Sequence, residues 1–377
     1  MQHYKQRREA TVHKPEKQSR EPLFHVVKRD LIAPQKALLI RVIAVLAAFM
    51  LCAVMAYFFI GANPFKFIKT VFSGAFGTTH RVWTLAKDSA ILLCLALAVT
   101  PAFRMRFWNL GADGQALIGA LAAILCASGL GGKIPNGVLL IIMLLASVLA
   151  GAVWGVLPAI FKAIWGTNES LFTLMMNYAA THFVTFSLLK WLVSDGSTTL
   201  SELPFGHLPK VYNEEFLVVL LSVVLTVLIF IYLNYTKQGY EVSVVGESEN
   251  TARYIGINVK KVTIRTMLIS GAVCGFTGFL IVSAFDHSIT AETIGGLGFT
   301  AIMVSWLAKF NPLVMIVTST LIAFLERGGA QISTDFNVSS AFPSLVVGLI
   351  LFFVIGCEFF INYRIKFRTS KKGGNDE

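Results

Sequence analysis

Polar residues inside long apolar segments are the part of this sequence best suited to handling a solute. A polar side chain in lipid is costly unless it has a partner or faces water. The first such cluster, Trp108-Asn-Leu-Gly-Ala-Asp-Gly-Gln115, opens an apolar segment and sets Asn109 and Asp113 four residues apart on one helix face. The cluster either caps an ordinary helix or begins a broken helix within the membrane, where its polar groups satisfy free backbone groups.

We expect Gly111, Asp113 and Gly114 to brace that helix start. The two glycines give the backbone room to turn, and Asp113 is expected to accept hydrogen bonds from N–H groups at the start of its own helix. Asn109 and Gln115 are predicted to lie on a substrate path, with Gln115 in contact with substrate.

A second cluster, Thr167-Asn-Glu-Ser-Leu-Phe-Thr-Leu-Met-Met-Asn-Tyr178, carries polar residues at helical spacing. Glu169, Thr173, Asn177 and Thr181 are each four residues apart, so they form a narrow polar stripe on an otherwise apolar helix. Such a stripe faces either neighbouring helices or a hydrophilic path. We assign Glu169, Thr173 and Asn177 to the path, with packing between helices as the favoured alternative for Thr173 and Thr181.

The segment 236–265 is rich in Lys and Arg, which indicates an internal loop. Ser248 could cap a short helix that Gly256 would end, and a plain loop would not need an ordered helix with exposed Tyr254 and Ile257. We therefore predict that the loop docks a soluble partner. Its candidate contact residues are Gly246, Glu247, Asn250, Ala252, Arg253, Gly256 and Ile257.

Catalytic and metal-binding patterns are missing from the sequence. It contains no G-x-x-x-x-G-K-[ST] phosphate loop, no HExxH and no CxxC, and its five cysteines lie inside apolar runs. We therefore expect neither an enzyme nor a bound metal or cofactor, and any energy must come from a partner.

The composition indicates a membrane protein. Of 377 residues, 55% are hydrophobic and 14% are charged, with a mean hydropathy of +0.68. The net charge of +11 is concentrated at the two ends and in the central loop, which suits loops facing anionic lipid better than a nucleic-acid groove, so we expect no nucleic acid.

The apolar segments and the charges between them predict an all-α polytopic fold of about ten transmembrane helices with both termini cytoplasmic. The predicted parts are a basic arm (1–36), a transmembrane domain (37–362) that includes the internal loop, and a cytoplasmic tail (363–377). The predicted spans are 37–60, 85–103, 112–130, 137–161, 170–193, 216–235, 266–285, 297–310, 311–326 and 341–361.

Two segments affect the predicted number of crossings, and two sets of glycines predict how helices pack. The short block 297–310 is counted because an external loop near Asp286 and an internal tail require an odd number of crossings. The segment 61–82 is expected to be an interfacial amphipathic helix, and the count fails if it crosses. Small-xxx-small faces at Gly151 and Gly155, and at Gly271, Gly275 and Gly278, predict closely packed helices.

Four motifs together resemble a known family. WNLGADGQ, NESLFTLMMNYAA, GYEVSVVGESENTARYIGINV and GLGFTAIMVSWLAKFNPL occur in the order seen in permease subunits of bacterial ABC importers. The similarity is to the nucleoside and simple-sugar branch, near the ribose and branched-chain amino acid permeases. Trp108, where Phe is usual, and Ser305-Trp306 depart from the pattern.

The resemblance implies a multi-pass protein of the bacterial plasma membrane that forms a path for a small polar substrate such as a nucleoside. It also implies three partners: a cytoplasmic ABC ATPase, a second permease subunit in a homo- or heterodimer, and an extracytoplasmic substrate-binding protein. The alternatives are a permease for another small solute such as a branched-chain amino acid, an ion-coupled secondary transporter, and a non-transporting membrane scaffold.

Overall fold

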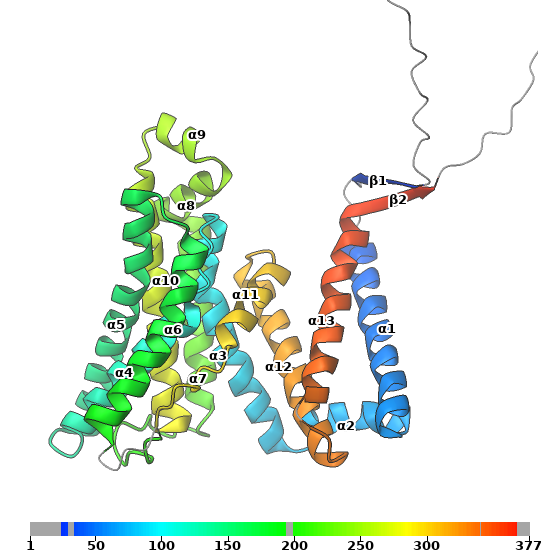
Figure 1. The fold of residues 1–377 in the computed structure, drawn as a ribbon, viewed down its shortest axis with the longest axis horizontal. Coiled ribbons are helices and arrows are strands. Elements are labelled where there is room, and N and C mark those ends of the chain that lie inside the picture. The colour runs from blue at the N-terminus through cyan, green and yellow to red at the C-terminus, as the bar shows by residue number, and fades with distance from the viewer. Residues whose placement is uncertain (1–23, 29–33, 194–198, 340, 368–377) are drawn as a thin grey trace, which may run out of the picture. The chain divides into compact units, whose positions relative to one another are not determined.

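The computed structural model describes residues 24–28, 34–193, 199–339 and 341–367, which form helices and one two-stranded ribbon (Figure 1). Most of the basic arm and the end of the tail therefore lie outside the described residues. The α-helices are α1 (Pro34–Ile60), α2 (Pro64–Phe76), α3 (Thr79–Arg104), α4 (Ala112–Leu130), α5 (Asn136–Trp165), α6 (Glu169–Ser187), α7 (Phe216–Tyr235), α8 (Lys237–Glu247), α9 (Glu249–Tyr254), α10 (Val259–Ile281), α11 (Leu297–Leu307), α12 (Pro312–Asp335) and α13 (Ala341–Asn362). Two π-helical turns, η1 (Leu188–Leu192) and η2 (Val282–Asp286), extend α6 and α10, and the strands are β1 (Phe24–Lys28) and β2 (Tyr363–Phe367).

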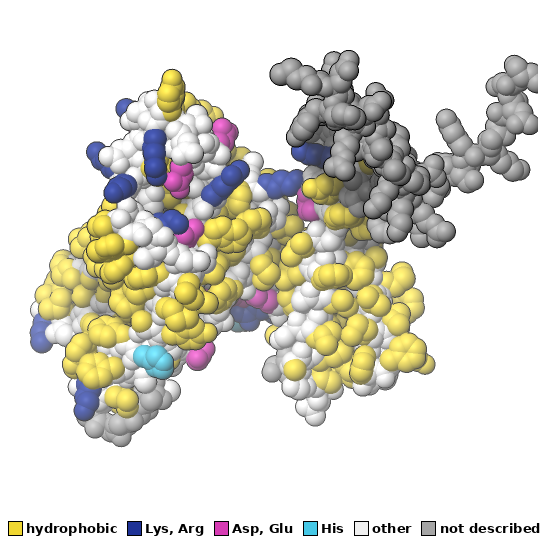
Figure 2. Space-filling view, turned by 45° about the horizontal axis from the view of Figure 1, so that its top comes forward, with side chains coloured by type: hydrophobic (Ala, Val, Ile, Leu, Met, Phe, Trp, Pro, Cys, Tyr) yellow, Lys and Arg dark blue, Asp and Glu magenta, His cyan; other side chains and the backbone are white. Residues whose placement is uncertain are grey.

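The polytopic helical fold class is confirmed. Eight helices in the described part of the chain are long and apolar enough to cross a membrane: 39–60, 79–104, 112–130, 136–165, 216–235, 259–286, 312–335 and 344–362. Lys and Arg side chains gather at the end of the body that carries α8 and α9, which matches the internal side expected from the sequence (Figure 2).

The count of ten crossings stays a prediction because it needs α6 and α11. α6 has 19 residues but carries the polar stripe, and it is not among the eight. α11 has 11 residues, a length of about 16 Å, whereas a bilayer core is about 30 Å thick. α11 alone is therefore half a span, and the stretch before it would have to complete the crossing.

α12 runs well beyond the apolar segment that predicted it. α12 continues to Asp335, although hydropathy alone ended it at Glu326. Arg327 pairs with Asp88 on α3, and Asp335 accepts a hydrogen bond from Thr70 on α2 at 3.3 Å. Because these charged groups have protein partners, the helix continues where apolar composition stops.

The segment 61–82 forms α2 and the beginning of α3. α2 packs one face on α12, where a Cβ added to Gly74 would lie 3.2 Å from the Cα atom of Gly328. Phe67 is fully buried, while Phe72 and Phe76 lie with their rings against Phe324. The three aromatic residues therefore do not share one lipid-facing stripe, and α2 is held by protein contacts.

The centre of the larger unit is built on glycine contacts among α4, α5 and α10. A Cβ at Gly151 would lie 2.4 Å from the carbonyl oxygen of Gly271, and one at Gly278 would lie 2.1 Å from that of Ala116. The backbones touch directly, so the predicted close packing of these glycine faces is confirmed.

Contacts divide the chain into two units, residues 1–51 with 349–377 and residues 52–348. In the first unit, Arg41 on α1 pairs with Glu358 on α13 at 2.5 Å. β1 and β2 pair antiparallel, with Phe24 opposite Phe367 and Lys28 opposite Tyr363. The second unit contains all the candidate site residues.

Candidate functional site

α4 begins inside the protein body because the chain turns back after α3. Residues 105–111 connect α3 to α4 and include Asn109, which is fully buried. Asn109 Nδ2 donates to Ser270 Oγ at 3.1 Å, and Ser270 lies about 16 Å along α10 from its first residue, Val259. The structure thus favours the broken-helix interpretation of this cluster over simple capping.

Asn109 and Gln115 hold the turn together. Asn109 Oδ1 accepts from Gly111 N at 3.0 Å and from Gln115 Nε2 at 3.1 Å. Gln115 is only 1% exposed, so its amide is occupied inside the protein. A contact of Gln115 with substrate stays a prediction; in this structure the Gln115 and Asn109 side chains form hydrogen bonds within the turn.

α6 fixes the same turn from the other side. Thr173 Oγ1 accepts from Leu110 N at 3.1 Å, and Asn177 bonds twice, accepting from Gly114 N at 2.9 Å and donating to Leu110 O at 2.8 Å. Thr173 is fully buried, which fits the packing alternative for this residue. The polar stripe therefore exists largely because the turn before α4 exposes backbone groups that need partners.

Asp113 joins two broken helices. Its Oδ1 accepts a hydrogen bond of 2.7 Å from the backbone N–H of Gly298, in the first turn of α11. We had expected the partner to lie in its own helix. The carboxylate instead stabilises the positive end of a neighbouring helix, and a Cβ at Gly298 would lie 2.8 Å from Asp113 Oδ1.

A cavity of about 180 Å³ lies where these elements meet, and we call it the central groove. It is lined from α4 by Asp113, Gly114 and Leu117, from α6 by Leu174, Asn177, Tyr178 and Thr181, from the segment leading into α11 by Ala291, Glu292, Ile294, Gly295 and Gly296, and from α11 by Phe299. Of the predicted path residues, Asn177 lines the groove, whereas Asn109, Gln115 and Thr173 lie buried beside it. Leu174 lines the groove together with Asn177.

Most of the lining residues were not expected from the sequence, and three of them, Tyr178, Phe299 and Glu292, carry aromatic or acidic side chains. Tyr178 follows Asn177 directly and is 59% exposed, and Phe299 on α11 is 44% exposed. Glu292 comes from a stretch interpreted only as an external acidic loop. After residue 286 the chain turns back into the larger unit before α11 starts, and no local sequence pattern predicts that turn.

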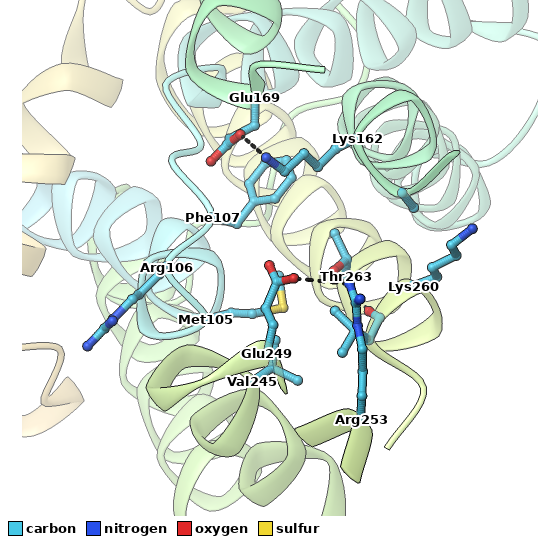
Figure 3. Close-up of a pocket in the computed structure, with 12 residues that line it drawn as sticks. Met105, Arg106, Phe107, Lys162, Glu169, Val245, Glu249, Arg253, Lys260 and Thr263 are labelled. Atoms are coloured by element: carbon cyan, nitrogen blue, oxygen red, sulfur yellow. Dashed lines mark hydrogen bonds and ion pairs between the residues drawn. The ribbon is translucent and has the colours of Figure 1, made fainter. Parts of the chain in front are cut away.

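Glu169 lies outside the central groove, in a second cavity of about 130 Å³ (Figure 3). Lys162 at the end of α5 points toward Glu169 at the start of α6, with Nζ 2.8 Å from Oε2. The cavity also borders Glu249 and Arg253 of α9, which form an ion pair of 3.3 Å. Glu169 therefore belongs to the end of the body next to the internal loop.

The internal loop contains the predicted short helix. Ser248 Oγ accepts from Thr251 N at 3.2 Å at the start of α9, and Gly256 has φ +85°, a left-handed conformation that ends the helix. α8, the longer helix before it, was not anticipated.

The predicted docking residues fall into two groups. Glu247, Asn250, Arg253 and Gly256 are exposed. Gly246 packs on the carbonyl of Arg104. Ala252 is fully buried in an apolar cluster, and Ile257 packs against that cluster. These three residues therefore position the exposed docking residues but are not part of the exposed surface. Tyr254 and Ile255, 93% and 53% exposed, supply its apolar part.

The external side has an ordered contact between residues 203–208 and η2. Leu203 N donates to His287 O, and Leu208 N donates to Ser283 O, each at 2.9 Å. The rings of His207 and His287 stack with centroids 3.7 Å apart and planes 2° apart. Burial, followed by the charge on His207, lowers the pKa of His287.

Most of the carboxylates that an ion-coupled transporter would need already have partners within the protein. Asp88 pairs with Arg327, Glu169 with Lys162, Glu358 with Arg41, and Asp113 with the Gly298 N–H. Among the described residues no cluster of three or more His, Cys, Asp or Glu could hold a metal ion. Coupling to a cation therefore finds little support.

Comparisons with known proteins agree with this architecture. A family model described as the permease component of the branched-chain amino acid transport system matches residues 82–355. The chain is 27% identical to the guanosine ABC transporter permease protein NupP of Bacillus subtilis, covering 81% of this chain and 89% of the relative. It is 27% identical to the glucose ABC transporter permease protein TsgB13 of Haloferax volcanii (84% and 85% covered) and 24% identical to the nucleoside ABC transporter permease protein NupB of Lactococcus lactis (85% and 91% covered).

Proposed function

We propose that this chain, which belongs to the family of permease components of the branched-chain amino acid transport system, carries a nucleoside through the central groove. It is a multi-pass protein of the cell membrane and the membrane-spanning subunit of an ABC importer for nucleosides or sugars. A permease subunit is not itself an enzyme, and we assign ATP hydrolysis to a separate cytoplasmic ATPase.

The observation that carries the substrate proposal is the lining of the central groove. Asp113, Glu292 and the Asn177 amide offer acceptors for ribose hydroxyl and base N–H groups, and Tyr178 and Phe299 offer aromatic surface. A nucleoside combines many donors with a planar ring and has no net charge. The guanosine and nucleoside permeases among the relatives support the same substrate class.

A branched-chain amino acid fits the groove less well. Its carboxylate calls for a cationic partner, and neither Lys nor Arg is among the lining residues. The two carboxylates that do line the groove would repel the carboxylate of the amino acid. We therefore place nucleosides ahead of amino acids.

The remaining partners follow from this role. The ATPase docks on the exposed residues Glu247, Asn250, Arg253, Tyr254 and Ile255 of the internal loop. A second permease subunit, either a copy of this chain or a related one, faces the groove and completes the path. An extracytoplasmic binding protein delivers the substrate.

The test is transport by the reconstituted complex. Proteoliposomes containing this chain, its permease partner and the ATPase would be given the binding protein and labelled guanosine, uridine, ribose, glucose or leucine, with ATP on the ATPase side. We expect ATP-dependent uptake of the nucleosides. Uptake of leucine or glucose alone would refute the nucleoside assignment.

A further inference from the structure

Two partly exposed indole rings contact each other and take no part in the braces of the central groove. Trp108 precedes the buried turn, and Trp306 lies near the end of α11, far away in the sequence. Their ring centroids are 5.4 Å apart with planes inclined by 35°, and the residues are 45% and 48% exposed. We call these two rings the Trp pair.

The Trp pair is held from behind by two further rings. Phe103, 4% exposed, contacts Trp108 edge-on at 5.8 Å and Trp306 at 6.2 Å, and Phe310 stacks on Phe103 with planes 8° apart. The four rings come from α3, the turn after it, α11 and the turn after α11. Their arrangement fixes both indoles while one side of each stays open.

The turns that place these rings have an uncommon backbone. Arg106 has φ +61°, and the consecutive residues Lys309 and Phe310 have φ +51° and +59°. Residues other than glycine rarely adopt these angles, and they persist only where the surroundings impose them. The cluster is therefore a determined part of the fold and not a chance meeting of surface aromatics.

The Trp pair is continuous with the central groove. Along α11, Phe299, Met303 and Trp306 share the exposed face, while Ala301, Val304 and Ser305 are buried. Phe299 lines the groove, and Trp306 lies about 10 Å further along the helix. Trp108 joins this face through its ring contact with Trp306, and its backbone carbonyl lies 3.4 Å from Thr173 Oγ1 on α6.

We infer that the Trp pair is a stacking surface that holds the planar base of the nucleoside on its way from the central groove toward the internal side. The inference rests on the proposed function and adds a specificity-determining site to it. Stacking on an indole needs a flat aromatic face and no particular hydrogen-bonding edge, so it favours nucleosides over free sugars and larger bases over smaller ones. The groove's carboxylates and amide would recognise the ribose, and the Trp pair would recognise the base.

The experiment compares guanosine with uridine in the reconstituted, ATP-driven complex. Trp306→Ala and Trp108→Ala should each lower the guanosine uptake rate about tenfold and uridine uptake less, because the purine loses more stacking area. Trp306→Phe keeps an aromatic face and should stay within about threefold of wild type. Trp165→Ala, an exposed tryptophan at the end of α5 outside the groove, is the matched control and should leave both rates unchanged.

A second measurement does not depend on turnover. Irradiation of the complex with 8-azidoguanosine, followed by peptide mapping, should label Trp108, Trp306 or their immediate neighbours, and an excess of guanosine should prevent the labelling.

The possible results separate the two proposals. If the wild-type complex imports no nucleoside, the proposed function fails. If it imports guanosine but the two alanine variants keep the guanosine-to-uridine ratio, the stacking inference alone is overturned. Equal losses for Phe and Ala at position 306, with label confined to other segments, would show that the rings only support the fold.

Discussion

The side-chain amide of Asn177 on α6 holds the backbone on both sides of the break before α4, donating to Leu110 O at 2.8 Å and accepting from Gly114 N at 2.9 Å. One residue therefore lines the central groove and sets its shape. Movement of α6 would move the start of α4 with it, and through Asp113 the start of α11.

Gly114 of α4 packs directly against the backbone of α6, so replacing it tests this coupling. In Gly114→Ala the new Cβ would lie 2.9 Å from Asn177 Oδ1 and 3.0 Å from Asn177 Cα. We expect a loss of about 1–3 kcal/mol in stability and a larger loss of transport. Gly129→Ala, in the same helix with nothing within 4 Å of the new Cβ, should be neutral or slightly stabilising in a thermal-shift assay.

Removal of the Asp113 carboxylate should destabilise the junction of the two broken helices. Asp113→Ala leaves the Gly298 N–H without its partner, at a cost of about 1–3 kcal/mol. Asp113→Asn retains an accepting oxygen, so its yield of folded protein should lie between those of wild type and the alanine variant. Yields in the reverse order would refute a bracing role.

Cysteine accessibility can establish which face of α6 is accessible to water. In a background without the five native cysteines, single cysteines at Asn177, Thr181 and Leu174 should react with a small water-soluble thiol reagent, because these positions line the groove. Phe183, 41% exposed and about 180° around the helix from Leu174, serves as the control on the opposite face and should stay unreactive. Equal protection at all four positions would favour pure helix packing.

Gly256 is predicted to matter through its backbone. It has φ +85° and open space around its missing Cβ, so a larger residue would meet strain rather than a clash. Gly256→Val should uncouple ATP hydrolysis from uptake while the protein still inserts, whereas Gly256→Asn, which tolerates this conformation, should keep most coupling. Normal coupling in the valine variant would contradict the docking assignment.

Acid should loosen the external contact at η2. The pKa of His287 is lowered from 6.5 in the folded protein, so the contact is stabilised above about pH 6.5 and loses stability as the pH falls through the folded pKa. Glu202 and Glu214 oppose this shift without cancelling it. The wild-type thermal midpoint should therefore fall more between pH 7.5 and 5.5 than that of His287→Phe, which keeps a stacked ring but cannot titrate.

The sequence predicted the features that short segments determine. Hydropathy located the spans, Ser248 and Gly256 delimited α9, and the glycine faces identified the tight packing of α5 on α10. Polar residues inside apolar segments also led to the correct neighbourhood of the groove, since such residues are retained only where they have partners or water.

Individual roles could not be predicted because they depend on contacts between distant segments. Gln115 was predicted to contact substrate, and the sequence did not show that its amide donates a hydrogen bond to Asn109. Asp113 was matched to its own helix because nothing local points to Gly298, 185 positions away. The end of α12 was misplaced for the same reason, since the partner of Arg327 is on α3.

The antiparallel ribbon of β1 and β2 constrains how the chain threads the bilayer. Residues 24–28 and 363–367 exchange backbone hydrogen bonds, so they occupy one aqueous compartment. A chain that enters and leaves a membrane domain on the same side has crossed it an even number of times. Ten passages satisfy this parity and nine violate it, so if α6 traverses the bilayer, the stretch 287–307 must traverse it too.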